Sequence, residues 1–254
     1  AVMSMAQKLG MFTSATMMFG HIEGVADRID HMQRVRDAQD RALAANWPGR
    51  YVSFIAWPFQ RENTPLGRLK EWDPESSEPF PGDVLADMVF SGRLDRLDRA
   101  ACDQAVPGAG KRLRMAGAAE YLRTQAVARL FLDNIHSIGS SWVTMGPKIG
   151  QLALFFGATD MGSVMMEENV VSAAGTTYCL NEQLLCHLIR AAGYIPAQRD
   201  NTYRLLRTHT GSEAPDLQVR DWSTMRVARL HQEQATTGAA APSAPVALTV
   251  ERAR

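Results

Sequence analysis

Strand-length apolar runs alternate with helix-length amphipathic segments along this chain, and no other feature of the sequence constrains the fold as strongly. The sequence predicts four strands, over Thr13–Phe19, Tyr51–Trp57, Ser140–Thr144 and about Ala158–Val164. Each is followed by a segment whose apolar residues recur three and four positions apart, as on one face of a helix. Strands joined through helices in this way run parallel, with right-handed crossovers. The pattern indicates an α/β fold, either a small doubly wound sheet or half of an eight-stranded barrel.

The helices between these strands carry recognisable start and stop residues. They are predicted over Val2–Leu9, Asp27–Ala45, Ala118–Leu132, Pro147–Gly157 and Asn181–Ala192. Proline opens the fourth of these helices, and the side chain of Asn181 can cap the fifth. On the second helix, the apolar spacing turns Met32 toward the core and Arg28 toward solvent.

Two segments do not fit the alternation. Arg68–Ala116 is rich in proline, glycine and charged residues, and it is too long for an ordinary connection between a strand and a helix. We expect a surface insertion or a lid there, with a short helix near Asp83–Phe90. The residues from about Thr236 onward are dominated by alanine and proline, and this composition predicts disorder.

Charge and cysteine content argue against several classes of protein. Acidic and basic side chains balance at 27 each, so neither nucleic acid nor an anionic membrane is an expected partner. No apolar run approaches the roughly 20 residues that span a bilayer, and no secretory signal is recognisable. Cys102, Cys179 and Cys186 are too few and too scattered for a disulfide scaffold or a zinc site. We expect a cytoplasmic protein with reduced thiols.

Polar residues and glycine gather where the first predicted strand ends, in the sequence FGHIEG. Gly20 lets a ligand approach the backbone, while His21 and Glu23 can bind a polar substrate or exchange protons. The alternative for Glu23 is structural, because a carboxylate at the start of the following helix stabilises the helix dipole. In a barrel, the strand ends converge on one mouth, so this cluster is a candidate site.

The second strand end offers a flat apolar residue with two amides after it. Trp57 can line a pocket for a purine or an aromatic ring, and Gln60 and Asn63 can read polar edges. The alternative is that the aromatic residue packs in the core, which is the more frequent arrangement.

The third and fourth strand ends add Thr144, Ser163 and the tandem carboxylates Glu167-Glu168. Two buried carboxylates raise each other's pKa, which suits acid–base chemistry. Adjacent helical residues face different directions, however, so only one of the pair is expected to point into a site. The other is expected to begin a helix.

Six segments carry a longer pattern: SATMMFGHIEG, FQRENTPLG, EYLRTQAVARLFLDNI, SWVTMGPKIGQLALFFGA, MMEENVVSAAG and PAQRDNTY. In this order they resemble the C-terminal half of radical S-adenosylmethionine (SAM) enzymes of the futalosine route to menaquinone. The resemblance is greatest to the cyclases that act on dehypoxanthine futalosine. The aminofutalosine synthases of the same route are similar around GHIE and LDNI.

This resemblance implies the C-terminal half of a (β/α)8 radical SAM barrel plus a C-terminal extension, with the N-terminal half missing. Residues 1–67 would hold βα units five and six, 68–116 the insertion, 117–205 units seven and eight with a C-terminal helix, and 206–254 the extension and tail. It also implies a [4Fe–4S] cluster, SAM and an external electron donor. The family's cluster motif CxxxCxxC is absent, so we expect no metal ligands in this chain and no activity from it alone.

The implied reaction closes the small-molecule substrate dehypoxanthine futalosine to cyclic dehypoxanthinyl futalosine. By position, the residues expected beside SAM are Gly20, Glu23 and Trp57, and those expected to face the substrate are Gln60, Asn63, Thr144 and Ser163. The candidates for catalytic roles are His21, Glu23 and Glu168. Two alternatives stay open: an aminofutalosine synthase of the same pathway, and a non-catalytic half-barrel subunit.

Overall fold

The computed structural model describes residues 2–105, 111–164, 173, 178–222, 228–229 and 247–252 of the chain. The elements up to residue 131 are α1 (Val2–Lys8), β1 (Thr13–Phe19), α2 (Val25–Ala44), β2 (Tyr51–Pro58), η1 (Leu66–Arg68), α3 (Pro81–Phe90), α4 (Arg99–Gln104) and α5 (Ala118–Phe131). They are followed by β3 (Ser137–Gly139), α6 (Trp142–Met145), α7 (Pro147–Ala153), η2 (Leu154–Phe156), β4 (Asp160–Ser163), β5 (Tyr178–Cys179), α9 (Glu182–Ala191), β6 (Tyr194–Arg199), β7 (Leu205–Thr208), η3 (Pro215–Gln218), β8 (Ala228–Arg229) and β9 (Ala247–Arg252).

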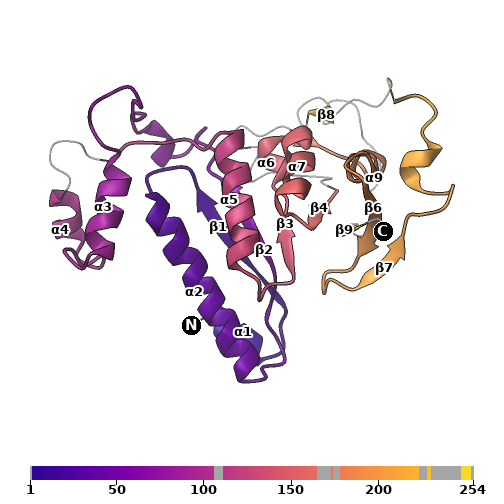
Figure 1. Ribbon diagram of the computed structural model, residues 1–254, viewed down its shortest axis with the longest axis horizontal. Coiled ribbons are helices and arrows are strands. Elements are labelled where there is room, and N and C mark those ends of the chain that lie inside the picture. Colours follow the sequence, from indigo (N-terminus) through magenta and orange to yellow (C-terminus); the bar gives the residue numbers. More distant parts are fainter. Residues whose placement is uncertain are drawn as a thin grey trace.

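Seven strands form one sheet in the order β1-β2-β3-β4-β9-β6-β7, so neighbours in the sheet are not all neighbours in the chain (Figure 1). Strands β1 to β4 run parallel, as the alternation of strands and helices predicts. Strands β9, β6 and β7 continue the sheet, each antiparallel to its neighbours. The predicted α/β class is confirmed, and the parallel part is consistent with part of a radical SAM barrel.

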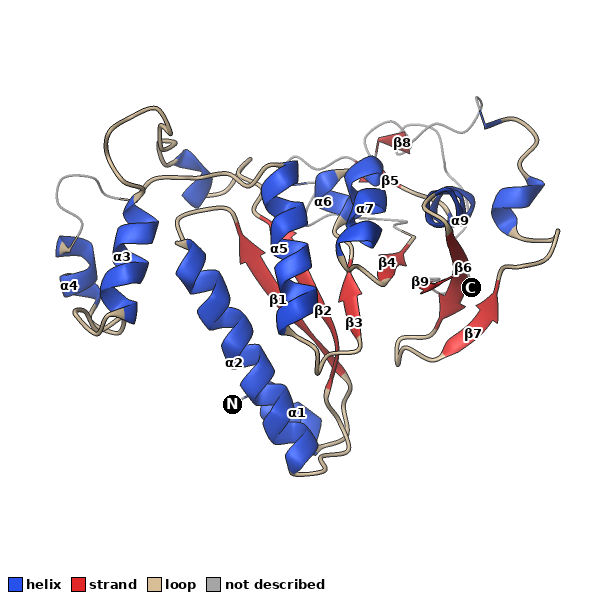
Figure 2. Ribbon diagram, viewed as in Figure 1, coloured by secondary structure: helices blue, strands red, loops and turns tan. Residues whose placement is uncertain are grey.

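Helices α2, α5 and α7 lie over one face of the parallel strands (Figure 2). Alternate side chains of β1 point toward these helices, and Met17 is buried in one core with Met32 and Tyr121. The residues between them point to the opposite face, where Met18 is 54% exposed. In the parallel register Met18 lies beside Trp57 of β2, which is 43% exposed. Within the described chain, the sheet therefore presents an uncovered apolar strip on the face away from the helices.

The third strand lies earlier in the chain than predicted. Strand β3 covers Ser137–Gly139, whereas the predicted Ser140–Thr144 contains the helical turn α6, so that prediction is wrong. Trp142 is buried, and its indole N–H donates to the Met161 carbonyl at 2.6 Å. Tryptophan, valine and threonine have high strand propensity, but the packing of this one indole outweighs the propensity of the segment.

Two predictions about helical side chains have opposite outcomes. Asn181 caps α9 as expected, because its side chain accepts a hydrogen bond from the Leu184 amide at 2.9 Å. Arg28 on α2, predicted to face solvent, is only 4% exposed. A helix pattern places Arg28 opposite the apolar stripe, but it does not reveal that carboxylates from two other segments cover that position.

The end of the chain also differs from expectation. The composition from Thr236 onward predicts disorder, but residues 247–252 form β9, so this prediction is wrong there. The backbone of β9 lies between two strands, with Thr249 opposite Asp160 of β4 and Val250 opposite Pro196 of β6. Backbone pairing on both sides gives a strand its order whatever the composition of the residues before it.

A buried ion pair joins the C-terminal hairpin to the parallel strands. The Arg199 guanidinium of β6 donates to the carboxylate of Asp160, the first residue of β4, and both side chains are buried. The ring of Tyr203 stacks on the same guanidinium at 3.7 Å, a cation–π contact. Burial raises the pKa of Asp160, although the hydrogen bond from Arg199 opposes that shift. The hairpin is thus attached to β4 by side chains as well as through β9.

Candidate functional site

The turn after β1 is organised around one carboxylate. Glu23 Oε1 accepts from the Gly20 amide at 2.7 Å, and Oε2 accepts from the His21 amide at 2.9 Å. Gly20 has φ 81°, a left-handed conformation that favours glycine, and a Cβ there would lie 2.6 Å from that of Ala116. The sequence cluster at this strand end is therefore a physical cluster, although Gly20 meets protein at the position where a ligand was expected.

Glu23 is held in its charged form. Burial opposes ionisation, but hydrogen bonds from His21 and Gly20, together with the charge of His21, outweigh it and lower the pKa of Glu23 to about 2. A carboxylate with such a low pKa is a weak base at neutral pH. The geometry therefore favours a positioning role for Glu23 over the proton exchange that the sequence also allows.

A buried arginine links this turn to the next unit of the fold. Arg28 Nε donates to Glu23 Oε1 at 2.8 Å, and Nη1 donates to Glu120 of α5 at 2.5 Å. The guanidinium carbon also lies 4.9 Å from the centre of the Phe19 ring. Sequence reasoning missed Arg28 and Glu120. The sequence does show a carboxylate five residues before an arginine at a strand-to-helix turn. This spacing is also common in surface turns, so it does not indicate a buried ion pair.

His21 presents its imidazole between protein partners and open space. Nδ1 lies 2.8 Å from Glu23 Oε2 and also accepts from the Ile22 amide at 2.8 Å. The neutral ring with its proton on Nε2 suits the Ile22 contact, whereas the charged ring donates to Glu23. The ring packs edge-on against Phe59, with centroids 5.8 Å apart. Nε2 has no hydrogen-bond partner among the described residues, so it is available to a ligand.

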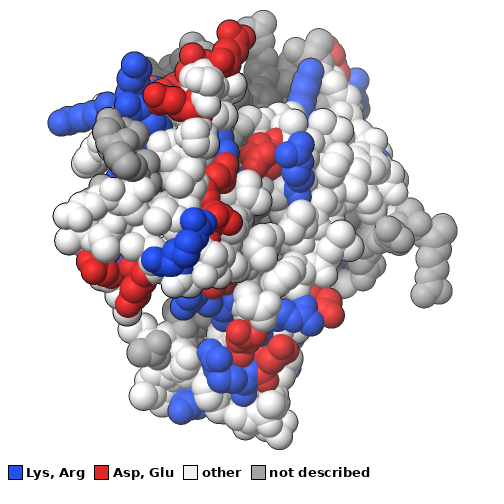
Figure 3. Space-filling model, turned by 60° about the vertical axis from the view of Figure 1, so that its left-hand side comes forward, with Lys and Arg blue, Asp and Glu red and all other residues white. Residues whose placement is uncertain are grey.

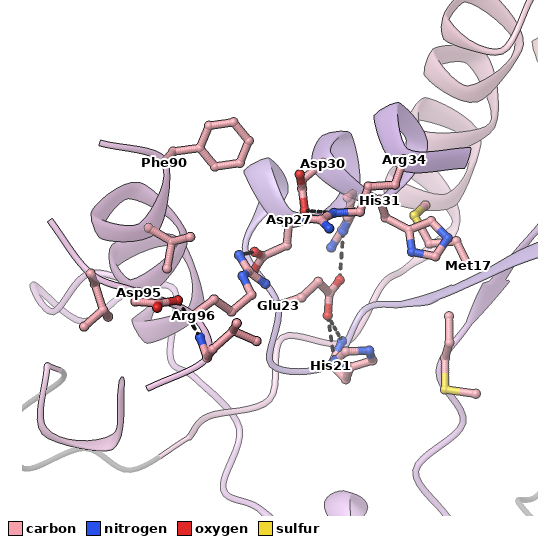
Figure 4. A pocket seen from close by; sticks show the side chains of 15 residues that line it. Met17, His21, Glu23, Asp27, Asp30, His31, Arg34, Phe90, Asp95 and Arg96 are labelled. Atoms are coloured by element: carbon pink, nitrogen blue, oxygen red, sulfur yellow. Dashed lines mark hydrogen bonds and ion pairs between the residues drawn. The ribbon is translucent and has the colours of Figure 1, made fainter. Parts of the chain in front are cut away.

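A cavity of about 780 Å³ lies beside this turn, between α2 and the α3–α4 segment (Figure 4). One wall carries Asp27, Asp30, His31 and Arg34 of α2, and the other carries Phe90, Asp95 and Arg96. His21 and Glu23 lie at one end of it. Its charges are largely paired with one another, as Arg34 pairs with Asp30 at 2.8 Å. Met17, Met18 and Phe90 add apolar surface to this polar lining.

The residues predicted at the second strand end divide between exposed and protein-bound positions. Trp57 lies one residue before the end of β2 with its side chain partly exposed, as a pocket-lining role requires. Gln60 Nε2 donates to the Pro58 carbonyl at 3.1 Å. Asn63, with φ 56°, donates to the Ala173 carbonyl at 2.8 Å. Asn63 therefore connects the loop after β2 to the segment after β4.

The third and fourth strand ends contribute less than expected. Thr144 lies in α6 rather than at a strand end, and its hydroxyl donates to the Ser141 carbonyl at 3.1 Å. Ser163 is the last residue of β4, as predicted. Glu168 lies outside the described residues. Of the predicted site residues that the structure describes, only Gly20, His21 and Glu23 are in direct hydrogen-bond contact with one another.

The face of the molecule in Figure 3 carries charges of both signs. Lysine and arginine side chains are interspersed with aspartate and glutamate on the face in Figure 3, rather than gathered in a patch of one sign. Within the described residues, no group of three or more histidine, cysteine, aspartate or glutamate side chains is placed to hold a metal ion. None of the described helices has both the length and the apolar character that crossing a bilayer requires.

The pKa of Glu23 predicts a defined pH dependence of stability. A carboxyl group whose pKa falls from 4.5 to about 2 on folding stabilises the fold by about 3 kcal/mol above pH 4.5, and loses this as the pH falls toward 2. We expect the stability gap between wild type and Glu23→Gln to shrink by about that amount between pH 6 and pH 2.5. Urea denaturation at several pH values measures it. Glu62→Gln, at an exposed carboxylate, is the control, and a constant Glu23 gap would contradict the assignment.

Comparison with known proteins gives consistent matches. Residues 108–211 match the family model for the CofH/MqnC C-terminal region. The chain is 38% identical over 214 residues to a cyclic dehypoxanthine futalosine synthase of Halalkalibacterium halodurans, and 36% identical over 208 residues to one of Streptomyces coelicolor. It is 33% identical over 211 residues to an aminodeoxyfutalosine synthase of Thermus thermophilus. The resemblance that the six sequence segments carry is confirmed.

These alignments are long relative to this chain and short relative to its relatives. They cover 84%, 82% and 82% of the chain, in the order given above. They cover 44%, 40% and 44% of the relatives. The chain thus spans less than half the length of the curated relatives it matches.

Proposed function

Because the chain is a homologue of cyclic dehypoxanthine futalosine synthases and carries a CofH/MqnC C-terminal region, we propose that it serves the same reaction. That reaction is the radical SAM conversion of dehypoxanthine futalosine to cyclic dehypoxanthinyl futalosine in menaquinone biosynthesis, carried out in the cytoplasm. The observation that carries the proposal is 38% identity over 84% of this chain. The parallel strands, with His21 and Trp57 at their carboxyl ends, support it, because a β/α barrel keeps its chemistry at that edge.

The residues of this chain do not fit the cluster that the reaction requires. A [4Fe–4S] cluster needs thiolates close together, but Cys102 lies in α4, Cys179 in β5 and Cys186 on the buried face of α9. Burial also raises the pKa of the Cys186 thiol to about 12, which keeps it protonated. The cluster ligands and the contact for an electron donor would therefore come from outside these 254 residues.

What this chain would contribute is positioning of SAM and substrate. Met18 and Trp57 form an exposed apolar platform suited to the adenine ring of SAM. Gly20 and Glu23 fix the turn beside it, so that His21 can offer Nε2 to a polar group. The residues proposed to contact the rest of the substrate are Gln60, Asn63, Thr144 and Ser163, with Glu168 as the proposed acid–base group.

A second candidate comes from the same set of relatives. The 33% identity to an aminodeoxyfutalosine synthase over 82% of this chain favours that activity as the alternative within the pathway. A third candidate is a non-catalytic half-barrel subunit. It is favoured because the three cysteines do not form a cluster of thiolates. The three candidates make different predictions about turnover.

An anaerobic assay separates them. The reading frame that encodes this chain is expressed together with its upstream sequence. The resulting protein is then supplied with SAM, dithionite and one of two substrates, dehypoxanthine futalosine or the enolpyruvyl benzoate substrate of aminofutalosine synthases. Formation of cyclic dehypoxanthinyl futalosine is the expected result. Formation of an aminofutalosine would establish the alternative enzyme, and substrate binding with no product would establish the non-catalytic subunit.

The proposed platform makes a separate prediction about affinity. Trp57→Ala should weaken binding of SAM by about tenfold, because it removes one side of an aromatic stack. Isothermal titration with S-adenosylhomocysteine measures the affinity without turnover. Trp47→Ala is the matched control, since Trp47 lies just after the far end of α2 and contacts Lys8. If both variants lost the same affinity for S-adenosylhomocysteine, Trp57 would not be part of the SAM site.

A further inference from the structure

The segment predicted as an insertion or lid is in backbone contact with the His21–Gly24 turn. The Arg114 amide donates to the His21 carbonyl at 2.9 Å. A Cβ on Gly82 would lie 2.3 Å from the Ile22 carbonyl oxygen, and one on Gly24 would lie 2.6 Å from that of Gly82. Side chains at these two glycines would force the segments apart, so the close approach depends on both of them. The contact therefore requires glycine on both sides, Gly24 in the turn and Gly82 in the insertion.

An ion pair joins the two parts of the insertion that contact the turn, residue 83 in α3 and residue 114 near its end. Arg114 donates to Asp83 through both terminal nitrogens, at 2.5 and 3.1 Å, which is the bidentate geometry of a strong arginine–carboxylate pair. The Phe80 ring lies 4.0 Å from the guanidinium carbon and stacks on it. Asp83 Oδ1 also accepts from the Val25 amide at 3.0 Å. Burial alone would raise the pKa of Asp83, but the bonds from Arg114 and Val25 lower it, so the pair is charged at neutral pH.

These contacts act at both ends of one short turn. Arg114 holds the carbonyl of His21, where the turn leaves β1, and Asp83 holds the amide of Val25, where α2 begins. A second ion pair, Arg96 with Asp27, joins the segment just before α4 to the first turn of α2. The backbone of the turn is thus held at both ends, and the contacts of the His21 ring with Glu23 and Phe59 then keep the ring at the cavity.

We propose that Asp83 and Arg114 are positioning residues for His21, and that residues 80–105 and 111–116 form a fixed wall of the site rather than a lid that opens. The proposal rests on the proposed function only in taking His21 as a site residue. Asp83 and Arg114 touch no reacting group. Their effect passes through the backbone of the turn to the orientation of the imidazole.

Hydrogen exchange and histidine NMR on the 254-residue chain test this directly. Asp83→Asn keeps the shape of the side chain but weakens the pair with Arg114. We expect exchange of the Val25 amide to rise by about tenfold or more, and the imidazole ¹⁵N shifts of His21 to change, while amides of β2 keep their protection. Asp87→Asn is the matched control, because Asp87 lies on the same helix and pairs with Arg93 at 2.6 Å in solvent.

Arg114→Lys is the second variant, in case Asp83→Asn loses its fold. It keeps the charge and the backbone N–H but not the bidentate contact, so we expect the same changes to a smaller degree. Wild-type exchange at Val25 and unchanged His21 shifts in a folded variant would overturn the proposal. Neither measurement involves SAM or turnover, so a negative result in the cyclase assay would leave the positioning role standing.

Discussion

Arg28→Met should lower the free energy of unfolding by about 3–5 kcal/mol, the range for removing one partner of a buried ion pair. Methionine fills a similar volume, but it leaves Glu23 largely buried without its cationic partner. Glu120 loses a partner as well, and α5 loses its side-chain contact with the turn. Urea denaturation followed by circular dichroism measures the loss, and Arg28→Lys should retain part of the stability.

Arg34→Met is the matched control for Arg28. Arg34 lies on the same helix and pairs with Asp30 at 2.8 Å, but its side chain is 74% exposed. Surface pairs of this kind contribute about 0.3–0.5 kcal/mol, so Arg34→Met should be close to wild type. If both variants lost the same stability, the effect would come from the helix itself, and the buried network would have no special role.

Arg199→Met should produce a second large loss, again about 3–5 kcal/mol, because Asp160 stays buried without its partner. Burial already raises the pKa of Asp160, and without Arg199 it would rise further. The folded state would then bind a proton that the unfolded state releases near pH 4, so stability should fall as the pH rises. Urea denaturation at pH 5 and pH 8 tests this sign.

The double variant Asp160→Leu with Arg199→Met should recover much of this stability, because two apolar side chains replace the buried pair. Arg204→Met is the control on the same hairpin, since its pair with Asp200 lies largely in solvent. A loss in Arg204→Met as large as that in Arg199→Met would show that the hairpin as a whole, and not the buried pair, sets the stability.

The strands that sequence predicts correctly are those with a continuous apolar run and a clear stop. Strand β1 begins and ends where predicted, and β2 ends one residue later, at Pro58. Strand β3 is only three residues long, and its neighbour segment has strand-like composition without being a strand. Which of the two segments forms the strand depends on the buried position of Trp142 and on the Met161 carbonyl that accepts its N–H. The local sequence around Trp142 does not contain this information.

The candidate site shows the same division between local and distant information. The cluster of Gly20, His21 and Glu23 is visible in sequence because its members are within four positions of each other. Arg28 and Asp83 are not recognisable, because their partners lie 92 and 31 residues away in Glu120 and Arg114. A charged residue on a helix is usually solvated, and only the packing of distant segments buries Arg28 and gives Asp83 its partner.

The place of β9 in the sheet has a consequence for biosynthesis. Residues 247–252 pair with β4 and with β6, so β9 lies between two strands that are made earlier. Strands β1 to β4 can assemble as they emerge from the ribosome, since the chain is made from its N-terminus. The β6–β7 hairpin can join them through the backbone only when β9 arrives. Such long-range closure raises the contact order and slows this step of folding, so the hairpin stays separate from the parallel strands until β9 has been made.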